Sequence, residues 1–175
     1  MESGASSAPA GTQCLSRIAG DAASGWRFQS LGDHLRRSGE FGAAFGSAEW
    51  AALAGLYHDL GKCHPAFQGY LRASSGYDPA AGNPKERFDH AVTGAVLAVE
   101  RFGLIGRLLA YVIAGHHAGL ADWVSVDSPA GSLSDRLARL QSQLQATRAA
   151  GGLPQDILDA ALPTAPPPIR TEEGM

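Results

Sequence analysis

The histidines are the residues of this 175-residue sequence best suited to chemistry, because there are six of them and two stand directly before a second metal-binding side chain. His58 is followed by Asp59, and His116 is followed by His117. Imidazole and carboxylate groups are common ligands of Mn, Fe, Ni and Zn. A carboxylate has two oxygens and can bridge two ions, so Asp59 among histidines predicts a binuclear site. The candidate ligands are His34, His58, Asp59, His90, His116 and His117.

Two neighbouring metal ions favour the hydrolysis of phosphate esters. Ions about 3.5–4 Å apart activate a water molecule and stabilise both the attacking and the leaving oxygen. Lys62 follows His58 by one helical turn, so its ammonium group is a candidate to neutralise charge on the phosphoryl group. Asp59 and Lys62 are therefore the candidate catalytic residues. His64 belongs to no doublet and is interpreted as a loop residue or a residue behind the ligands.

Each of these features also has a simpler interpretation. A histidine on the apolar face of a helix, such as His34, is often a hydrogen-bonded core residue, and the pair His116 and His117 can stand on a surface by chance. Lys62 can simply interact with the dipole at the end of its helix. The metal site is favoured because five histidines and one aspartate fall on successive predicted helices.

Hydrophobic periodicity predicts an all-α fold that positions these residues. Gly61 is expected to end the second helix as a left-handed cap, and Gly103 is expected to separate the fourth helix from the fifth. No strand alternation longer than about four residues is present. The expected helices begin near Trp26 and continue over residues 50–60, 65–71, 88–102, 104–117, 132–144 and 154–162.

The length allows one domain and hardly two. Residues 1–24 are predicted to be a disordered leader, residues 25–162 the helical domain, and residues 163–175 a proline-rich tail or linker. With 14 basic and 17 acidic residues, the net charge of 14 − 17 = −3 excludes a generally basic coat for nucleic acid. It leaves open an enzyme that grips nucleic acid locally.

The location in the cell is predicted from what the sequence lacks. Two cysteines, Cys14 and Cys63, are too few for a secreted disulfide scaffold. Residues 1–12 lack the basic and apolar regions of a signal peptide. The most apolar stretch, residues 104–114, is too short to span a bilayer. We therefore expect a cytoplasmic protein with no membrane partner.

Several segments resemble the motifs of CRISPR-associated HD nucleases, the nuclease domains of type I endonuclease-helicases. The sequence HDLGK at residues 58–62, continued by FQGYL at 67–71, resembles the HD motif of that family. The sequence GHHAGL at 115–120 resembles its tandem-histidine motif. Asp33-His34-Leu35 and Asp89-His90-Ala91 resemble the first and middle histidine motifs, and the resemblance covers roughly residues 25–170.

The resemblance implies a compact HD-type helical bundle around two divalent transition-metal ions, with Mn, Fe, Co or Ni expected and Mg as an alternative. It implies metal-dependent endonuclease cleavage of single-stranded DNA in antiviral defence, with Lys62 beside the ions. The implied ligands are His34, His58 and Asp59 for the first ion, and Asp59, His90, His116 and His117 for the second.

The resemblance also implies partners. These are single-stranded DNA, a helicase domain in the same or another polypeptide, and an RNA-guided surveillance complex that opens the target. An acidic chain fits this arrangement if its partners share the capture of the strand. The basic residues that are candidates for a local grip are Arg36, Arg37, Arg101 and Arg107.

One feature of the family is missing from this sequence. The family has a further aspartate, on a helix well downstream of the tandem histidines, as a ligand of the first ion. Asp122, Asp127 and Asp135 come too early, and Asp156 and Asp159 lie in a short stretch without the family pattern. We therefore expect a domain truncated at its C-terminal end. Two alternatives stay open: an HD phosphohydrolase acting on a nucleotide or cyclic nucleotide, and an inactive truncated remnant.

Overall fold

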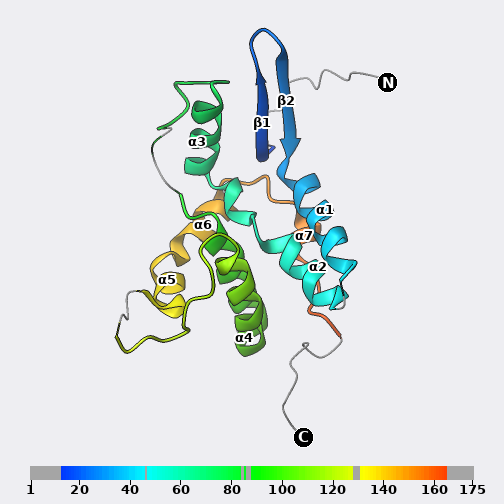
Figure 1. Ribbon diagram of the computed structural model, residues 1–175, viewed down its shortest axis with the longest axis vertical. Coiled ribbons are helices and arrows are strands. Elements are labelled where there is room, and N and C mark those ends of the chain that lie inside the picture. Colours follow the sequence, from blue (N-terminus) through cyan, green and yellow to red (C-terminus); the bar gives the residue numbers. More distant parts are fainter. Residues whose placement is uncertain (1–12, 46, 84, 86–87, 128–130, 165–175) are drawn as a thin grey trace, which may run out of the picture.

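The computed structural model describes residues 13–45, 47–83, 85, 88–127 and 131–164, which form a helical bundle with a β-hairpin at one end (Figure 1). Strand β1 (Leu15–Asp21) pairs antiparallel with β2 (Gly25–Ser30), and these are the strands of the described residues. The predicted all-α class is confirmed. The helices are α1 (Leu31–Ala43), α2 (Ala48–Tyr57), the 3-10 helix η1 (Leu60–Cys63), α3 (Pro65–Ser75), α4 (Ala91–Gly115), α5 (Leu133–Arg139), α6 (Gln141–Ala149) and α7 (Gln155–Leu158).

The hairpin is the main departure from the predicted elements. Strand β1 lies within the expected leader, and residues 26–30 are strand β2 where a helix was expected. The turn is closed by Asp21, whose carboxylate accepts hydrogen bonds from the backbone N–H of Ala23 and Ser24. Trp26 and Phe28 each make an edge contact with the ring of Tyr77, at 5.5 and 5.0 Å between ring centroids. Packing against Tyr77, which lies just after the end of α3, therefore stabilises residues that look helical by spacing alone.

Helices α1 and α2 are antiparallel and closely packed. Helix α1 begins after Ser30, whose hydroxyl accepts a hydrogen bond from the third residue of the helix. At the crossing there is no room for a side chain, because a Cβ on Gly55 would lie 2.5 Å from the carbonyl oxygen of Ser38. This close approach brings His34, in the first turns of α1, beside His58, which directly follows α2.

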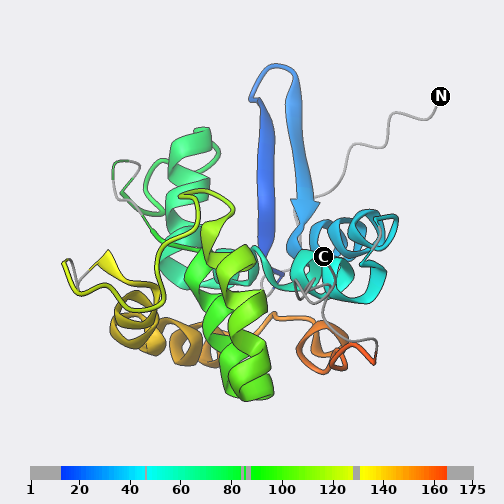
Figure 2. The same ribbon diagram turned by 60° about the horizontal axis from the view of Figure 1, so that its bottom comes forward.

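Helix α4 is a hairpin of two helical arms, as the expected break at Gly103 predicts. Gly103 has φ 57° and ψ −130°, a backbone conformation that only glycine adopts readily. The arms touch closely, since a Cβ on Gly106 would lie 2.1 Å from the carbonyl oxygen of Ala98. Figure 2 shows α4 at the front of the molecule. Because the chain reverses at Gly103, His90 before the first arm and His116 after the second lie at the same end.

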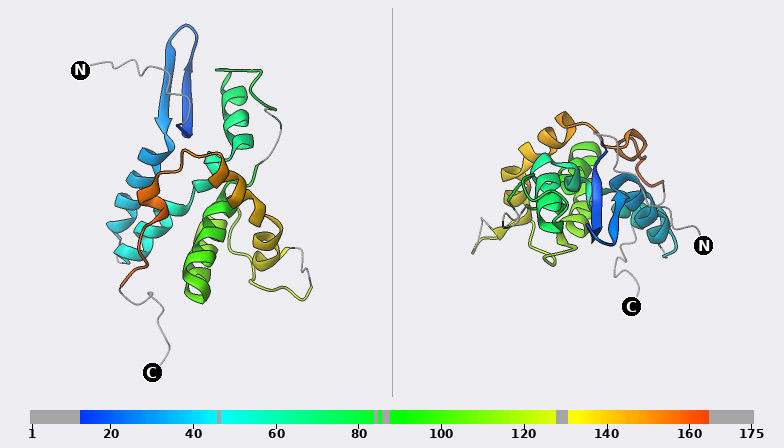
Figure 3. Two further views of the ribbon diagram at one scale, coloured as in Figure 1. Left: turned by 180° about the vertical axis from the view of Figure 1, so that it is seen from behind. Right: turned by 90° about the horizontal axis from the view of Figure 1, so that it is seen from above.

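Seen from behind, the C-terminal helices α5 and α6 lie beside α4, and α7 lies over α1 and α2 (Figure 3). Leu144 of α6 and Ile157 of α7 are fully buried in the same core as Tyr57 and Ile113. The single helix expected over residues 132–144 is divided at Leu140, where α5 ends and α6 begins.

A disulfide joins the start of the β-hairpin to the helical part of the fold. Cys14, directly before β1, forms a disulfide with Cys63 at the end of η1. No helix of the described residues is both long enough and apolar enough to cross a membrane. Residues 1–12 of the expected leader and residues 165–175 of the expected tail lie outside the described residues.

Candidate metal centre

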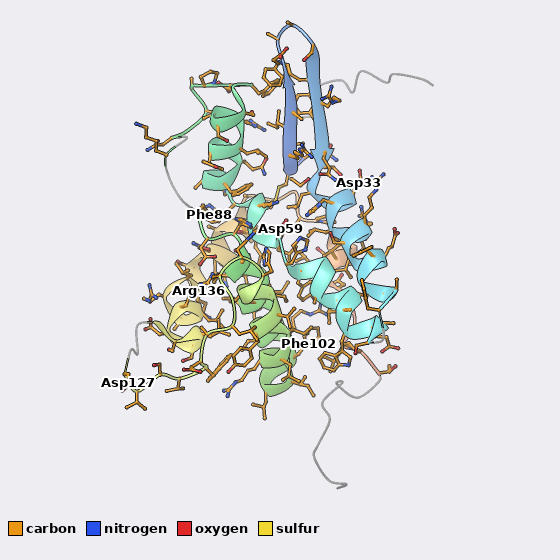
Figure 4. All side chains as sticks on the ribbon, in the orientation of Figure 1. Asp33, Asp59, Phe88, Phe102, Asp127 and Arg136 are labelled. Atoms are coloured by element: carbon orange, nitrogen blue, oxygen red, sulfur yellow. A yellow bond between two sulfur atoms is a disulfide. The ribbon has the colours of Figure 1, made fainter. Side chains whose placement is uncertain are left out.

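Asp59 lies at the centre of the molecule, where the ends of α1, α2 and α4 meet (Figure 4). Its side chain is only 4% exposed. Its Oδ2 lies 2.9 Å from His34 Nε2 and 3.1 Å from His58 Nε2. Its Oδ1 lies 3.2 Å from His90 Nε2 and 3.6 Å from His116 Nε2. The two oxygens of one carboxylate therefore face two different pairs of histidines.

The ligand atoms divide into two groups that share Asp59, and within each group they lie within 4.8 Å of one another. In the described part of the chain, no other histidine, cysteine, aspartate or glutamate joins either group. The structure thus brings together all six predicted ligands. We call the two sets the three-ligand group (His34, His58, Asp59) and the four-ligand group (Asp59, His90, His116, His117).

Backbone carbonyls orient two of the rings for metal binding. The Nδ1 of His58 donates to the carbonyl oxygen of Gly55 at 2.8 Å, and the Nδ1 of His116 donates to that of Ile113 at 2.6 Å. In a neutral ring the proton is then on Nδ1, so the lone pair of Nε2 faces Asp59. Two facing acceptors need a proton or a cation between them. A hydrogen bond at the far ring nitrogen is the usual way in which a protein orients a metal-binding histidine.

A buried oxygen without a partner supports the same conclusion. Asp59 Oδ1 is buried and makes no hydrogen bond. Leaving a buried acceptor unsatisfied costs about 1–3 kcal/mol, and more for a charged group. A cation bound between Asp59 and His90 would satisfy this oxygen. The nitrogen and carboxylate donors of the two groups suit divalent transition metals, so the residues present fit a metal centre.

The histidines keep Asp59 ionised. Burial raises the pKa of the Asp59 carboxyl. In the metal-free protein, interactions with the four surrounding rings, where these carry a proton on Nε2, outweigh burial and hold that pKa far below its usual range. Interaction with Asp59 in turn raises the pKa of His116. Burial lowers the pKa of His117, and the neighbouring His116 lowers it further. Asp59 is therefore a carboxylate at any physiological pH, as a bridging ligand must be.

Lys62 lies inside the centre and is not a solvated charge at a helix end. Its Nζ is 2.8 Å from Asp59 Oδ2, the oxygen that also faces the three-ligand group, and its side chain is 17% exposed. Gly61 does not have a positive φ, so the left-handed cap expected there is wrong. It is needed instead for a close approach, because a Cβ would lie 2.2 Å from the carbonyl oxygen of His90.

The sequence profile of the family described as Cas3, HD domain, matches residues 18–166. The chain belongs to this family. Membership makes it a metal-dependent nuclease domain of CRISPR defence, which acts on nucleic acid. The match begins inside β1, so most of the hairpin lies within the matched region. No curated protein matches the chain.

Gln68 has a role in this Cas3 HD domain that spacing alone does not reveal. Its Nε2 donates to the carbonyl oxygens of Lys62 at 2.7 Å and Leu15 at 2.8 Å, and its Oε1 accepts from Leu15 N at 3.1 Å. One side chain therefore ties η1, which carries Lys62, to strand β1. Phe67 before it packs 5.1 Å from the ring of His90. The pair Phe67-Gln68 supports the centre from behind.

His64 lies outside both groups. It is the residue before α3, and its Nδ1 accepts a hydrogen bond from Ala66 N at 3.2 Å. Its ring stacks on Phe88 at 4.5 Å, and burial lowers its pKa. His64 therefore starts a helix and does not point into the centre.

Three of the four candidate basic residues have partners within the chain. Arg36 pairs with Asp156 at 3.0 Å, and the guanidinium of Arg107 lies 4.5 Å from the ring centroid of Trp123. Arg101 donates to the hydroxyl of Tyr57 at 2.7 Å. These side chains hold the fold together, which leaves little of their charge for a DNA strand.

Proposed function

We propose that this Cas3 HD domain is an endonuclease that cleaves single-stranded DNA with two divalent metal ions. The observation that supports this most directly is the position of Asp59, whose two oxygens face separate groups of histidines. A bridging carboxylate between histidine groups is suited to holding two ions close together.

In this proposal each group holds one ion. The ions supply an activated water and stabilise the attacking and leaving oxygens of the scissile phosphate. Lys62, next to the three-ligand group, holds the phosphate oxygens and offsets their negative charge. Five histidine nitrogens favour Mn, Fe, Co or Ni, whereas Mg prefers oxygen ligands and is the less suitable alternative.

The depth of the centre favours a single strand as substrate. The histidines that face Asp59 are 17–25% exposed and Asp59 is 4% exposed, so bound ions would lie below the surface. A flexible single strand can bend to bring one phosphate into such a site, and a stiff duplex reaches it less readily. The substrate is therefore expected to be DNA that has already been unwound.

Partners then supply the DNA. The chain has a net charge of −3, and Arg36, Arg101 and Arg107 interact with its own residues. Strand capture is consequently assigned to a helicase domain, in the same or another polypeptide, that follows an RNA-guided surveillance complex. In this proposal the nuclease acts in antiviral defence, in the cytoplasm.

The test combines metal analysis with a nicking assay. Wild-type protein loaded with Mn²⁺ should bind two ions per chain and linearise circular single-stranded DNA, and it should leave relaxed duplex circles intact. Asp59→Asn should lose both the ions and the cleavage. His64→Asn is the matched control, because it changes a histidine outside both groups and keeps a side chain that can start a helix. Equal cleavage by wild type and Asp59→Asn would contradict the proposal.

Two further results separate the alternatives. Release of phosphate or of a linear product from nucleotides or cyclic nucleotides, with no DNA cleavage, would select a phosphohydrolase. One ion or none per chain and no turnover on any substrate would select an inactive remnant. Lys62→Met should keep both ions and lose most of the cleavage, because it removes only the group assigned to the phosphate.

A further inference from the structure

The open end of the α4 hairpin is closed by the side chain of Arg136, from α5. Its Nε and Nη2 donate to the two oxygens of Asp89 at 2.8 and 2.9 Å. Its Nη1 donates to the carbonyl oxygen of Ala114 at 3.1 Å. One guanidinium thus joins the residue before His90 to a residue at the end of the second arm, two positions before His116. Figure 4 shows Arg136 beside α4, on the side of Asp59 away from α1.

The helix that carries Arg136 is itself attached to the segment after the tandem histidines. The backbone N–H of Leu133 donates to the carbonyl oxygen of Asp122 at 2.8 Å, and that of Ser134 donates to Trp123 at 3.1 Å. Helix α5 therefore cannot shift without also moving the chain that follows His117. Arg136 is held in a fixed place relative to the ligands.

The pair between Arg136 and Asp89 is more enclosed than the other arginine–carboxylate pairs of the described residues. Its side chains are 22% and 32% exposed, whereas those of Arg148 and Glu100 are 34% and 42% exposed. A two-pronged arginine–carboxylate pair fixes geometry as well as charge, and a lysine cannot reproduce it. Because the pair is enclosed and Arg136 makes a third hydrogen bond to Ala114, Arg136 is suited to fixing the distance between the two ends of the α4 hairpin.

We infer that Arg136 is a positioning residue that sets the spacing of the four-ligand group. It does so by holding the two ends of the hairpin together, so that His90 and His117, whose Nε2 atoms are 3.0 Å apart, share one ion. The inference extends the proposed function, because it assumes that the four-ligand group binds that ion. It adds a residue outside the ligands and their motifs to the machinery of the centre.

The experiment is a calorimetric titration of metal-free protein with Mn²⁺. Arg136→Met should weaken one of the two binding steps by about 10–100-fold, the range found for residues that orient metal ligands, and leave the other step unchanged. Arg136→Lys should also weaken that step, since one ammonium group cannot replace the two parallel hydrogen bonds of the guanidinium to Asp89. Asp89→Asn should resemble Arg136→Met, and the double variant should add little, because both changes break one interaction. Arg148→Met is the matched control and should bind like wild type, since it breaks a pair that joins α6 to α4 far from the centre.

A second readout does not depend on metal. NMR signals of the ring nitrogens of His90 and His117 should shift in metal-free Arg136→Met, and those of His34 should not. If wild type binds no Mn²⁺, the proposed function fails, and the ring signals still decide the inference. Unchanged ring signals in Arg136→Met, or in Asp89→Asn should Arg136→Met not fold, would overturn it. Wild-type affinity in both binding steps would do the same.

Discussion

The two groups around Asp59 are built in different ways. The four-ligand group takes three histidines from the two ends of one helical hairpin, and Arg136 closes that hairpin. The three-ligand group takes its histidines from the start of α1 and the end of α2. Lys62 contacts Asp59 Oδ2, the oxygen that faces this group. The four-ligand group is thus held by the Arg136 interactions across the ends of its hairpin. The three-ligand group has one protein ligand fewer and has the ammonium group of Lys62 beside it.

This difference indicates a division of labour. Metal sites that act on substrates keep coordination positions free for water or substrate, whereas structural sites fill them with protein ligands. By this rule we expect the four-ligand group to anchor an ion, and the three-ligand group to leave room for water and the phosphate next to Lys62.

The strongest test removes the residue that both groups share. Asp59→Asn keeps the volume and removes the charge that faces four histidines, so both metal-binding steps should weaken by more than about 100-fold, beyond the effect of an orienting residue. Cleavage should fall below detection. Elemental analysis of dialysed protein gives the ion content, and circular dichroism shows whether the helices persist. Two bound ions in Asp59→Asn would mean that the groups do not depend on a shared carboxylate.

The next largest effect is the difference in metal affinity between the two groups, which sets the order in which they release their ions. With fewer protein ligands, the three-ligand group should release its ion first, with an affinity at least about tenfold lower, or about 1.4 kcal/mol. Stepwise addition of a chelator to the loaded protein should show two phases. His34→Ala should lack the weak phase and keep the tight one, whereas His117→Ala should lose the tight one. If His34→Ala instead lost the tight phase and His117→Ala the weak one, the three-ligand group would be the tighter site, which would contradict the expected order.

A smaller effect is expected where η1 joins the two groups. Gly61→Ala places a Cβ 2.2 Å from the carbonyl oxygen of His90, so η1 and the start of α4 must separate. We expect a loss of about 1–3 kcal/mol in the free energy of unfolding, the usual cost of overpacking, and weaker binding at the four-ligand group. Urea unfolding measures the first and calorimetry the second. Gly32→Ala is the control, because its Cβ would meet only the side-chain ends of Pro154 and Arg36.

The ligands could be predicted from the sequence because their signals are local. His58-Asp59 and His116-His117 are doublets, and the break at Gly103 predicts that His90 and His116 return to the same end of a hairpin. The long-range contacts could not be predicted in this way. Arg136 lies 47 residues from Asp89, and Gln68 lies 53 residues from Leu15, so neither pair leaves a pattern in a short window.

The β-hairpin was missed for a related reason. In β2 the alternation of Trp26 and Phe28 with polar residues is a strand signal, but it is short. The strand has only six residues and is followed directly by the helical spacing of α1. In β1 the first two residues are both buried, so the alternation that marks a half-buried strand is lost. The pairing of the two strands and the packing on Tyr77 decide the structure there, and both depend on the fold.

The smallest expected effect concerns His64, the histidine outside both groups. Its Nδ1 must be unprotonated to accept the hydrogen bond from Ala66 N, and burial lowers its pKa below the ordinary value of 6.5. Its contribution to stability should therefore be present above pH 6.5 and be lost as the pH falls through its lowered pKa. His64→Ala should be about 1 kcal/mol less stable than wild type at pH 8, and the gap should close toward pH 5. His64→Asn, which starts a helix without titrating, should keep its advantage over His64→Ala at both pH values. Urea unfolding of the three metal-free proteins measures these differences, and shifts of the other histidines cancel between variants. A gap between wild type and His64→Ala that stays constant from pH 8 to pH 5 would show that His64 acts by packing on Phe88, and the pH response of the molecule would then lie in the metal centre.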